Sequence, residues 1–286
     1  MLLVTAFVRA PAAPLEANRI SVFVSVLPQK YFVERIGDPH VDVSVMVGPG
    51  LSPEIYEPTP RQMTRLSQAH VYFCIGVPFE DAWMKRIAAT NPSMRMVDCG
   101  QEFPTGSTST YGRDDAPDAE SPSREDPHIW TSPKLVKGIA KHIRDALIEI
   151  DPAHRSEYER NHQGFIADLG RLDREIRALF ANAQIRKFMV FHPSWEYFAD
   201  TYGLEQIPIE IEGKQPGAKA LARLIDLGKA EQLRAIFVQK QFDVSIAEAI
   251  ASEIGAEIIQ VDPLAENYMD NLRYVAQLFA HSMGGR

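Results

Sequence analysis

Four side chains that can bind a metal ion fall at or beyond the carboxyl ends of predicted β-strands. They are Glu54 after the second strand, His128 after the fourth, His192 at the end of the fifth and Asp262 at the end of the eighth. In open parallel sheets, ligands bind beyond these strand ends. Two of the residues come from each half of the chain, so we expect them to meet in a cleft between two lobes.

Two imidazoles and two carboxylates suit a divalent transition metal, because imidazole favours zinc or iron and carboxylates extend the preference toward manganese. Four protein ligands would close a tetrahedral zinc site and leave no place for water, which favours binding over catalysis. The alternative is a metallohydrolase that uses His128, His192, a carboxylate and a bound water, with Glu54 as the general base. The motifs GxSxG and HExxH and a Gly-rich phosphate loop are absent from the sequence.

Each of the four residues also has an ordinary structural interpretation. Asp262 could cap the last helix, Glu54 could be a solvated loop carboxylate, and histidines are often partly buried. The remaining histidines are expected to be ordinary surface or strand-flanking residues: His40, His70, His142, His154, His162 and His281. Only their joint position at strand ends separates the four candidates from these.

The elements that must position the site alternate between strand and helix. Runs rich in β-branched residues predict strands at 20–27, 41–47, 70–76 and 94–100, and again at 187–192, 206–211, 235–239 and 257–262. Helical patterns lie between them. This predicts an α/β fold of two lobes, each a parallel four-stranded sheet with helices on both faces.

A long helical pattern separates the two halves. Residues 153–183 contain few helix breakers and would span roughly 45 Å at about 1.5 Å per residue. We therefore expect an N-terminal lobe at 18–150, an interlobe helix at 151–183 and a C-terminal lobe at 184–286. Residues 103–126 are polar and acidic and predict a mobile surface loop, either a solvated linker or a weak electrostatic collector of cations.

Composition narrows the class of protein. The 286 residues carry a net charge of −8, which argues against nucleic acid as a partner. An apolar run at 2–8 followed by "RAPAAPLEA" predicts an export signal cleaved near Ala17, although a basic start is missing and a mis-assigned start or disordered tail is the alternative. Cys74 and Cys99 are either two core residues or a disulfide.

Four motifs in order, "SPEIYEP", "DPHIWTSPK", "FHPSWEYFADTYG" and "VDPLAENYMDNL", resemble the zinc- and manganese-specific solute-binding proteins of bacterial ABC importers, the ZnuA/TroA-like family (cluster A-I). The resemblance runs from about residue 20 to residue 280. It implies two α/β lobes joined by one backbone helix, with one metal ion in the cleft. It also implies export to the periplasm, a permease partner in the inner membrane, a monomeric state and no enzymatic activity. A surface adhesin or metal chaperone on the same fold is a further possibility.

The resemblance implies that His128, His192 and Asp262 are ligands, but the first motif departs from the family pattern. The family usually has histidine in "SPHxYEP", where this sequence has Glu54. Glu54 either binds in place of the imidazole, which we favour, or stands back and leaves room for water. We expect zinc, with manganese or iron as alternatives. Trp130 and Tyr268 are either cleft-wall or packing residues.

Overall fold

The computed structural model describes residues 19–100, 126–210 and 213–284. The expected export signal lies outside these residues, as does the predicted acidic loop apart from its last residue, Asp126. None of the described helices combines the length and the apolar character needed to cross a membrane.

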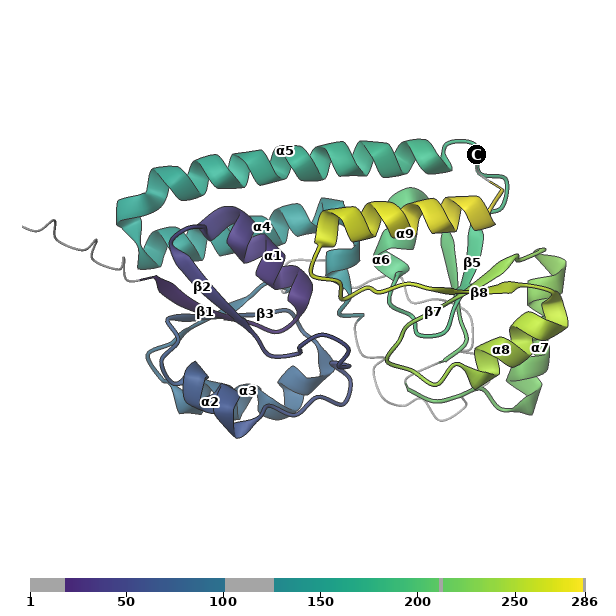
Figure 1. Ribbon diagram of the computed structural model, residues 1–286, viewed down its shortest axis with the longest axis horizontal. Helices are drawn as coiled ribbons and strands as arrows, with labels where there is room; N and C mark the ends of the chain where they lie inside the picture. Colours follow the sequence, from purple (N-terminus) through teal and green to yellow (C-terminus); the bar gives the residue numbers. More distant parts are fainter. Residues whose placement is uncertain (1–18, 101–125, 211–212, 285–286) are drawn as a thin grey trace, which may run out of the picture.

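The first half of the chain forms one parallel sheet with the strand order β2-β1-β3-β4. Its elements are β1 (Ile20–Val24), α1 (Leu27–Gly37), β2 (Val41–Val45), α2 (Pro60–Leu66), β3 (Val71–Cys74), α3 (Pro78–Thr90) and β4 (Arg95–Asp98). Helices α2 and α3 lie on one side of the sheet and α1 on the other (Figure 1). Because neighbouring strands are parallel, the loops after them gather at one edge of the sheet.

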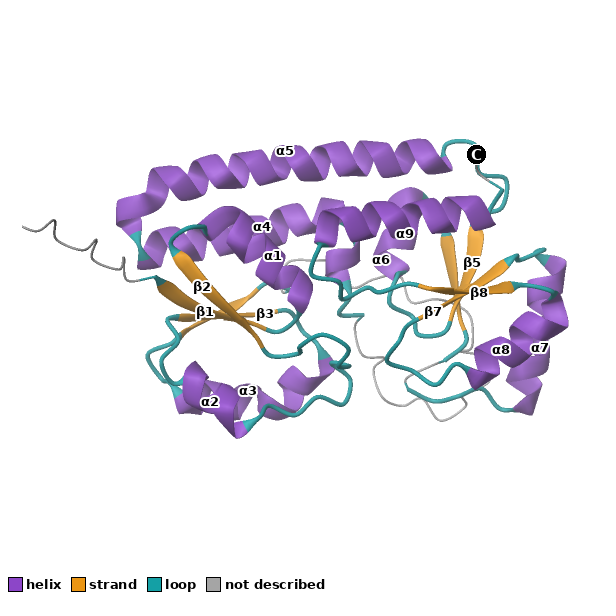
Figure 2. Ribbon diagram, in the orientation of Figure 1, coloured by secondary structure: helices purple, strands orange, loops and turns teal. Residues whose placement is uncertain are grey.

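The second half repeats this arrangement with the strand order β6-β5-β7-β8. Its elements are β5 (Lys187–Val190), α6 (Glu196–Tyr202), β6 (Glu205–Pro208), α7 (Ala218–Ala230), β7 (Ala235–Val238), α8 (Ser245–Ile254), β8 (Glu257–Gln260) and α9 (Tyr268–Ser282). Figure 2 shows the two sheets side by side with helices on both faces of each. The predicted fold class is confirmed.

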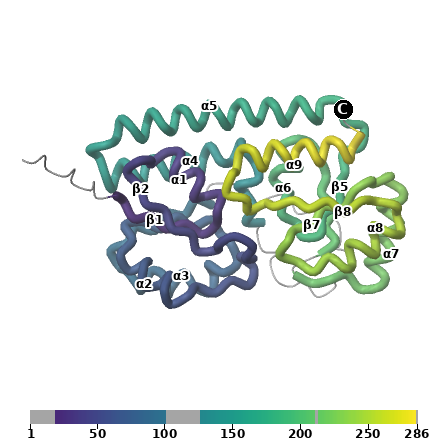
Figure 3. The backbone as a smooth tube through the Cα atoms, in the orientation of Figure 1, coloured from purple at the N-terminus to yellow at the C-terminus, as the bar shows by residue number. Residues whose placement is uncertain are grey.

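A long helix that follows the first sheet packs against elements of both halves. Helix α4 (Pro133–Ile150) is followed by a 3₁₀ turn at Pro152–His154 and by α5 (Arg155–Phe180). The 26 residues of α5 span about 39 Å. This helix contacts α1 and α4 from the first half and α9 from the second, and α9 runs alongside it (Figure 3). The long joining helix expected from the sequence is therefore present.

The buried core continues from the first sheet through these helices to one face of the second sheet. Phe279 of α9 packs against Phe188 of β5, Phe237 of β7 and Trp195, with ring centroids 4.4 to 5.5 Å apart. A separate cluster, which includes Met189 and Ile236, fills the other face under α7 and α8. Cys74 and Cys99 are both buried, and their thiols are free.

Candidate metal site

Three of the four predicted residues meet between the two sheets. Glu54 from the β2–α2 loop, His128 and His192 each present a ligand atom, and these atoms all lie within 4.8 Å of one another. Glu54 Oε1 is 3.8 Å from His192 Nε2, and the two imidazole centroids are 5.3 Å apart. Residues far apart in the chain thus converge on one point, as expected from their positions at strand ends.

Asp126 fixes both the backbone and the imidazole ring of His128. It immediately precedes the 3₁₀ turn η2 (Ile129–Thr131). One oxygen of Asp126, Oδ1, accepts the backbone N–H of His128 at 2.9 Å and lies 2.6 Å from its Nδ1. The side chain of Trp130 packs edge-on against the imidazole, with centroids 5.1 Å apart. A carboxylate at Nδ1 fixes the tautomer with its proton there, which leaves Nε2 as the nitrogen with a lone pair for a metal.

His192 is held in the same way at the end of β5. Its Nδ1 lies 3.1 Å from Oε1 of Glu210, which is buried and also accepts the backbone N–H of Gly213. The ring stacks on Phe242, with centroids 4.8 Å apart and 20° between the planes. Gln239 donates to the backbone carbonyl of His192 at 3.2 Å. Both imidazoles are therefore oriented by a carboxylate at Nδ1, an arrangement common around metal-binding histidines.

Carboxyl groups dominate the electrostatics around the two imidazoles. Glu54, Asp126 and Glu210 each lie beside one of the rings. Burial, followed by the nearby carboxylates of Asp200 and Asp126, raises the pKa of Glu196 to about 7. A concentration of negative charge of this kind favours a cation over an anion.

The cavity at this point is very small, about 20 Å³. It is lined by Ser52, Pro53, Glu54, His128, His192, Gln239, Gln241, Phe242, Pro263 and Leu264. A space of this size holds about one water molecule or one ion.

Asp262, the fourth predicted residue, lies next to the cavity but is not in the three-residue group. Strand β8 ends at Gln260, two residues earlier than the predicted strand end, so Asp262 belongs to the following loop. Its Oδ1 accepts the backbone N–H of Leu264 at 2.8 Å, and its carbonyl accepts the side chain of Asn271 at 2.7 Å. Its neighbours Pro263 and Leu264 line the cavity.

Trp130 and Tyr268 both lie in the buried core, and neither is among the residues that line the cavity. The indole N–H of Trp130 donates to the carbonyl of Pro263 at 2.8 Å, which ties the loop after β8 to η2. Tyr268 packs edge-on against Phe32 of α1, with centroids 4.8 Å apart. Trp130 thus supports the site from behind, and Tyr268 joins α9 to the first half.

Sequence reasoning missed the carboxylates that orient the two histidines. Asp126 is the last residue of the predicted acidic loop, and its position two residues before His128 is a recognisable signal for a local side-chain bond. Glu210 lies 18 residues after His192 and meets it only because β6 pairs with β5. Its strand-end position was the only available sign of its role.

Comparisons with known proteins agree with this geometry. Residues 22–281 match the family model described as ZnuA, the periplasmic component A of a zinc-uptake complex. A crystal structure of ZnuA is 42% identical, with a TM-score of 0.85, and the match covers 92% of this chain and 99% of that one. A ZnuA deletion mutant with zinc bound matches equally well, at 42% identity and a TM-score of 0.85 over 94% and 99% of the two chains.

A curated relative from Bacillus subtilis, the high-affinity zinc uptake system protein ZnuA, is 26% identical over 86% of this chain and 79% of its own length. The laminin-binding protein of Streptococcus agalactiae, described as an adhesin with metal-transporting activity, shares the fold with a TM-score of 0.80 at 21% identity over 93% and 99% of the two chains. The family model covers nearly the whole chain, and its members are transport components rather than enzymes. The chain belongs to the ZnuA family of periplasmic metal-binding components of zinc-uptake systems.

Proposed function

We propose that this chain captures one Zn²⁺ ion between its two sheets and delivers it to the permease of an ABC importer in the inner membrane. The observation that carries the proposal is the matched pair of imidazoles. His128 and His192 each have a carboxylate at Nδ1, and His192 turns Nε2 toward Glu54. Such pairing holds the rings in place before the metal arrives and increases their basicity.

The proposed ligands are Glu54, His128, His192 and Asp262. The first three already lie within reach of one ion. Asp262 is proposed as the fourth because its two following residues line the same cavity. Its carboxylate has two oxygens, and the bond to Leu264 uses only Oδ1. Trp130 supports Asp262 indirectly, since its bond to Pro263 fixes the adjacent backbone.

Zinc is proposed as the cargo because two imidazoles and four protein ligands match its tetrahedral preference. The family description and the zinc-bound ZnuA deletion mutant support the same ion. Manganese is the second candidate, because half of the proposed ligands are carboxylates and harder oxygen ligands favour Mn²⁺. A curated relative from Halalkalibacterium halodurans, 24% identical, is a manganese-binding lipoprotein.

The organisation proposed for this function is a monomer with lobes at 18–150 and 184–286 joined by the helix region 151–183. The two separate parallel sheets, with α5 packed against helices of both halves, support this division. A site made by loops from both halves allows a permease that separates the lobes to release the ion.

The test is metal titration of the demetallated chain, with elemental analysis of the bound ion. Wild type is expected to bind one zinc ion tightly and manganese more weakly. Glu54→Ala is expected to lose affinity, because it removes one of four ligands. The matched control is Glu57→Ala, an exposed carboxylate in the same loop, which should bind zinc as wild type does.

Absence of a tightly bound transition metal would contradict the proposal as a whole. Unchanged zinc affinity in Glu54→Ala would contradict direct ligation by Glu54 while leaving the other three ligands in place. Tighter binding of manganese than of zinc would show that manganese, not zinc, is the transported ion.

A further inference from the structure

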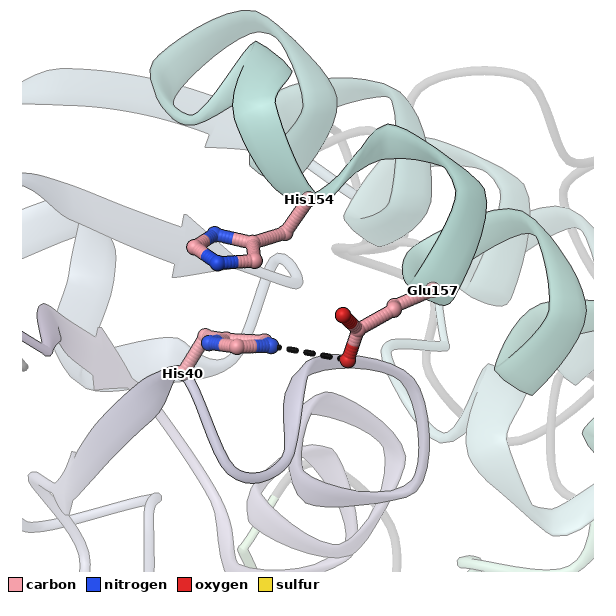
Figure 4. A group of neighbouring side chains, drawn as sticks. All are labelled: His40, His154 and Glu157. Carbon is pink, nitrogen blue, oxygen red and sulfur yellow. Dashed lines mark hydrogen bonds and ion pairs between the residues drawn. The ribbon is translucent and has the colours of Figure 1, made fainter.

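A second group of side chains that can bind a metal ion lies in the first half of the molecule, at the other end of the strands from the cavity. His40, His154 and Glu157 each offer a ligand atom, and these atoms all lie within 4.8 Å of one another. His40 Nε2 is 3.0 Å from Glu157 Oε2. The imidazoles of His40 and His154 stack, with centroids 3.7 Å apart and 21° between the planes (Figure 4). No local sequence pattern predicts this group, because the two histidines are 114 positions apart.

The group lies at the opposite edge of the sheet from the cleft, the small cavity lined by Glu54, His128 and His192. His40 immediately precedes β2, whereas the cleft lies beyond the carboxyl ends of the strands. His154 ends the 3₁₀ turn before α5 and Glu157 lies in the first turn of α5, at the end of the molecule remote from the second sheet (Figure 1). A ligand bound here would therefore be independent of the cleft ion.

The backbone around His40 is fixed against α5. Its N–H donates to the carbonyl of Gly37, and its own carbonyl accepts the N–H of Ile20, both at 2.8 Å. Asn161 of α5 donates its side-chain amide to the carbonyls of Ile36 and Asp38, at 3.1 and 3.3 Å. These bonds hold the turn that carries His40 beside the helix that carries Glu157.

His154 has the same support as the two histidines of the cleft. Its Nδ1 lies 2.6 Å from Oδ2 of Asp151, and the hydroxyl of Tyr158 donates to that same oxygen at 2.8 Å. The carboxylate fixes the proton on Nδ1 and leaves Nε2 for a ligand. This arrangement is more than a chance cluster of polar residues, because it orients one ring through a second, anchored carboxylate.

We propose that His40, His154 and Glu157 form a second binding site for a divalent transition cation such as Zn²⁺. Two imidazoles and one carboxylate supply three ligands, which leaves the remaining coordination to water. Asp151 and Glu157 together carry the charge that balances the ion. The ion would link the turn before β2 to the start of α5.

The site is expected to bind more weakly than the cleft. The side chains of His40, His154 and Glu157 are 15%, 39% and 39% exposed, so they are less rigidly held than the buried His128. The stacked rings must also turn so that their nitrogens converge on one ion, and this partial exposure gives them the room to do so. A weak, open site exchanges its metal with the surroundings without the help of a permease.

The experiment uses the full chain with the cleft disabled by His128→Ala and His192→Ala. Equilibrium dialysis against zinc, followed by elemental analysis, is expected to show one zinc ion per chain. Adding Glu157→Gln, which keeps the shape of this partly exposed side chain, is expected to remove that ion, and adding His154→Ala should do the same. The matched control is His281→Ala, which removes an exposed histidine at the end of α9 and should leave the zinc bound.

No zinc uptake by the cleft-disabled chain at millimolar zinc would overturn the proposal, and so would uptake that persists after both Glu157→Gln and His154→Ala. If the cleft-disabled chain does not fold, the same comparison is made in the wild-type background. There Glu157→Gln should reduce the zinc content from two ions to one, and an unchanged content would overturn the second site. The two proposals fail separately. If the cleft proposal is wrong, the wild-type chain lacks a tightly bound ion but still binds the weak one.

Discussion

At the scale of single residues, the site consists of imidazoles whose orientation is set by carboxylates. The ligand candidates could be predicted from the sequence because they stand at or near strand ends, where loops of a parallel sheet converge. The supporting carboxylates could not be predicted in this way, since the contact of Glu210 with His192 depends on the pairing of β5 and β6. Residue type and spacing thus predict the candidate ligands, and the fold determines how their side chains are oriented.

Replacing Glu210 with glutamine should weaken zinc binding about 10- to 100-fold, the usual effect of losing a carboxylate behind a metal-binding histidine. Glutamine can still accept the N–H of Gly213, so the loop is expected to keep its shape. Zinc titration of the demetallated variant measures the change. Glu257→Gln, at an exposed position in β8, serves as the control, and wild-type affinity in Glu210→Gln would show that the carboxylate does not tune His192.

At the scale of elements, the sequence predicts which segments form helices and which form strands, but it places the ends of these elements less accurately. Proline favours the first turn of a helix, yet α6 begins at Glu196, three residues after Pro193. The reason is tertiary: the Ser194 N–H bonds to the carbonyl of His192, and the side chain of Gln206, from β6, accepts the N–H of Trp195. A contact from a neighbouring strand therefore delays the helix in a way that local propensity does not reveal.

Another buried carboxyl joins three elements of the first half. Glu80, in the first turn of α3, accepts the backbone N–H groups of Ile75 and Gly76 after β3, and the hydroxyl of Ser25 after β1. The residue is only 4% exposed. Burial raises the pKa of Glu80 to about 7, although the three hydrogen bonds oppose the rise.

This raised pKa predicts a pH-dependent stability of the metal-free protein. The folded state holds the proton more tightly than the unfolded state, so the stabilisation is complete below about pH 4.5 and is lost as the pH rises through about 7. The pKa difference of about 2.5 units, at about 1.4 kcal/mol per unit, corresponds to a total loss of about 3.5 kcal/mol. Glu80→Gln, which cannot ionise, should match wild type near pH 5 and be more stable by roughly 1–3 kcal/mol at pH 8.

Urea unfolding of the demetallated proteins at the two pH values measures this difference. Comparing wild type with the variant at each pH removes the contributions of other titrating groups. Glu57→Gln, at an exposed position, is the control and should follow wild type at both. A constant difference between wild type and Glu80→Gln from pH 5 to pH 8 would show that Glu80 does not gain its charge inside the fold.

At the scale of the whole molecule, two sheets share one continuous core. The duplicated alternation of strands and helices predicted two lobes, but this continuity depends on α9, whose Phe279 packs against aromatic residues of the second sheet while its Tyr268 packs against Phe32 of α1. The meeting of His40 with His154 has the same origin, since the packing of α5 against α1 brings them together. Long-range packing of this kind has no local signature in a sequence.

A shared core predicts that the two sheets unfold together. In native-state hydrogen exchange of the metal-free chain, the slowest amides of the central strands β1 and β5 should report the same free energy of opening. Because the proposed ion binds residues of both halves, zinc at about 1,000 times the Kd of the cleft should raise both values by about 4 kcal/mol. The chain with His128→Ala and His192→Ala should show no such rise at the same zinc concentration. Two distinct opening energies without metal would show that the halves are separate folding units, and a zinc effect confined to one sheet would place the tight ion outside the cleft.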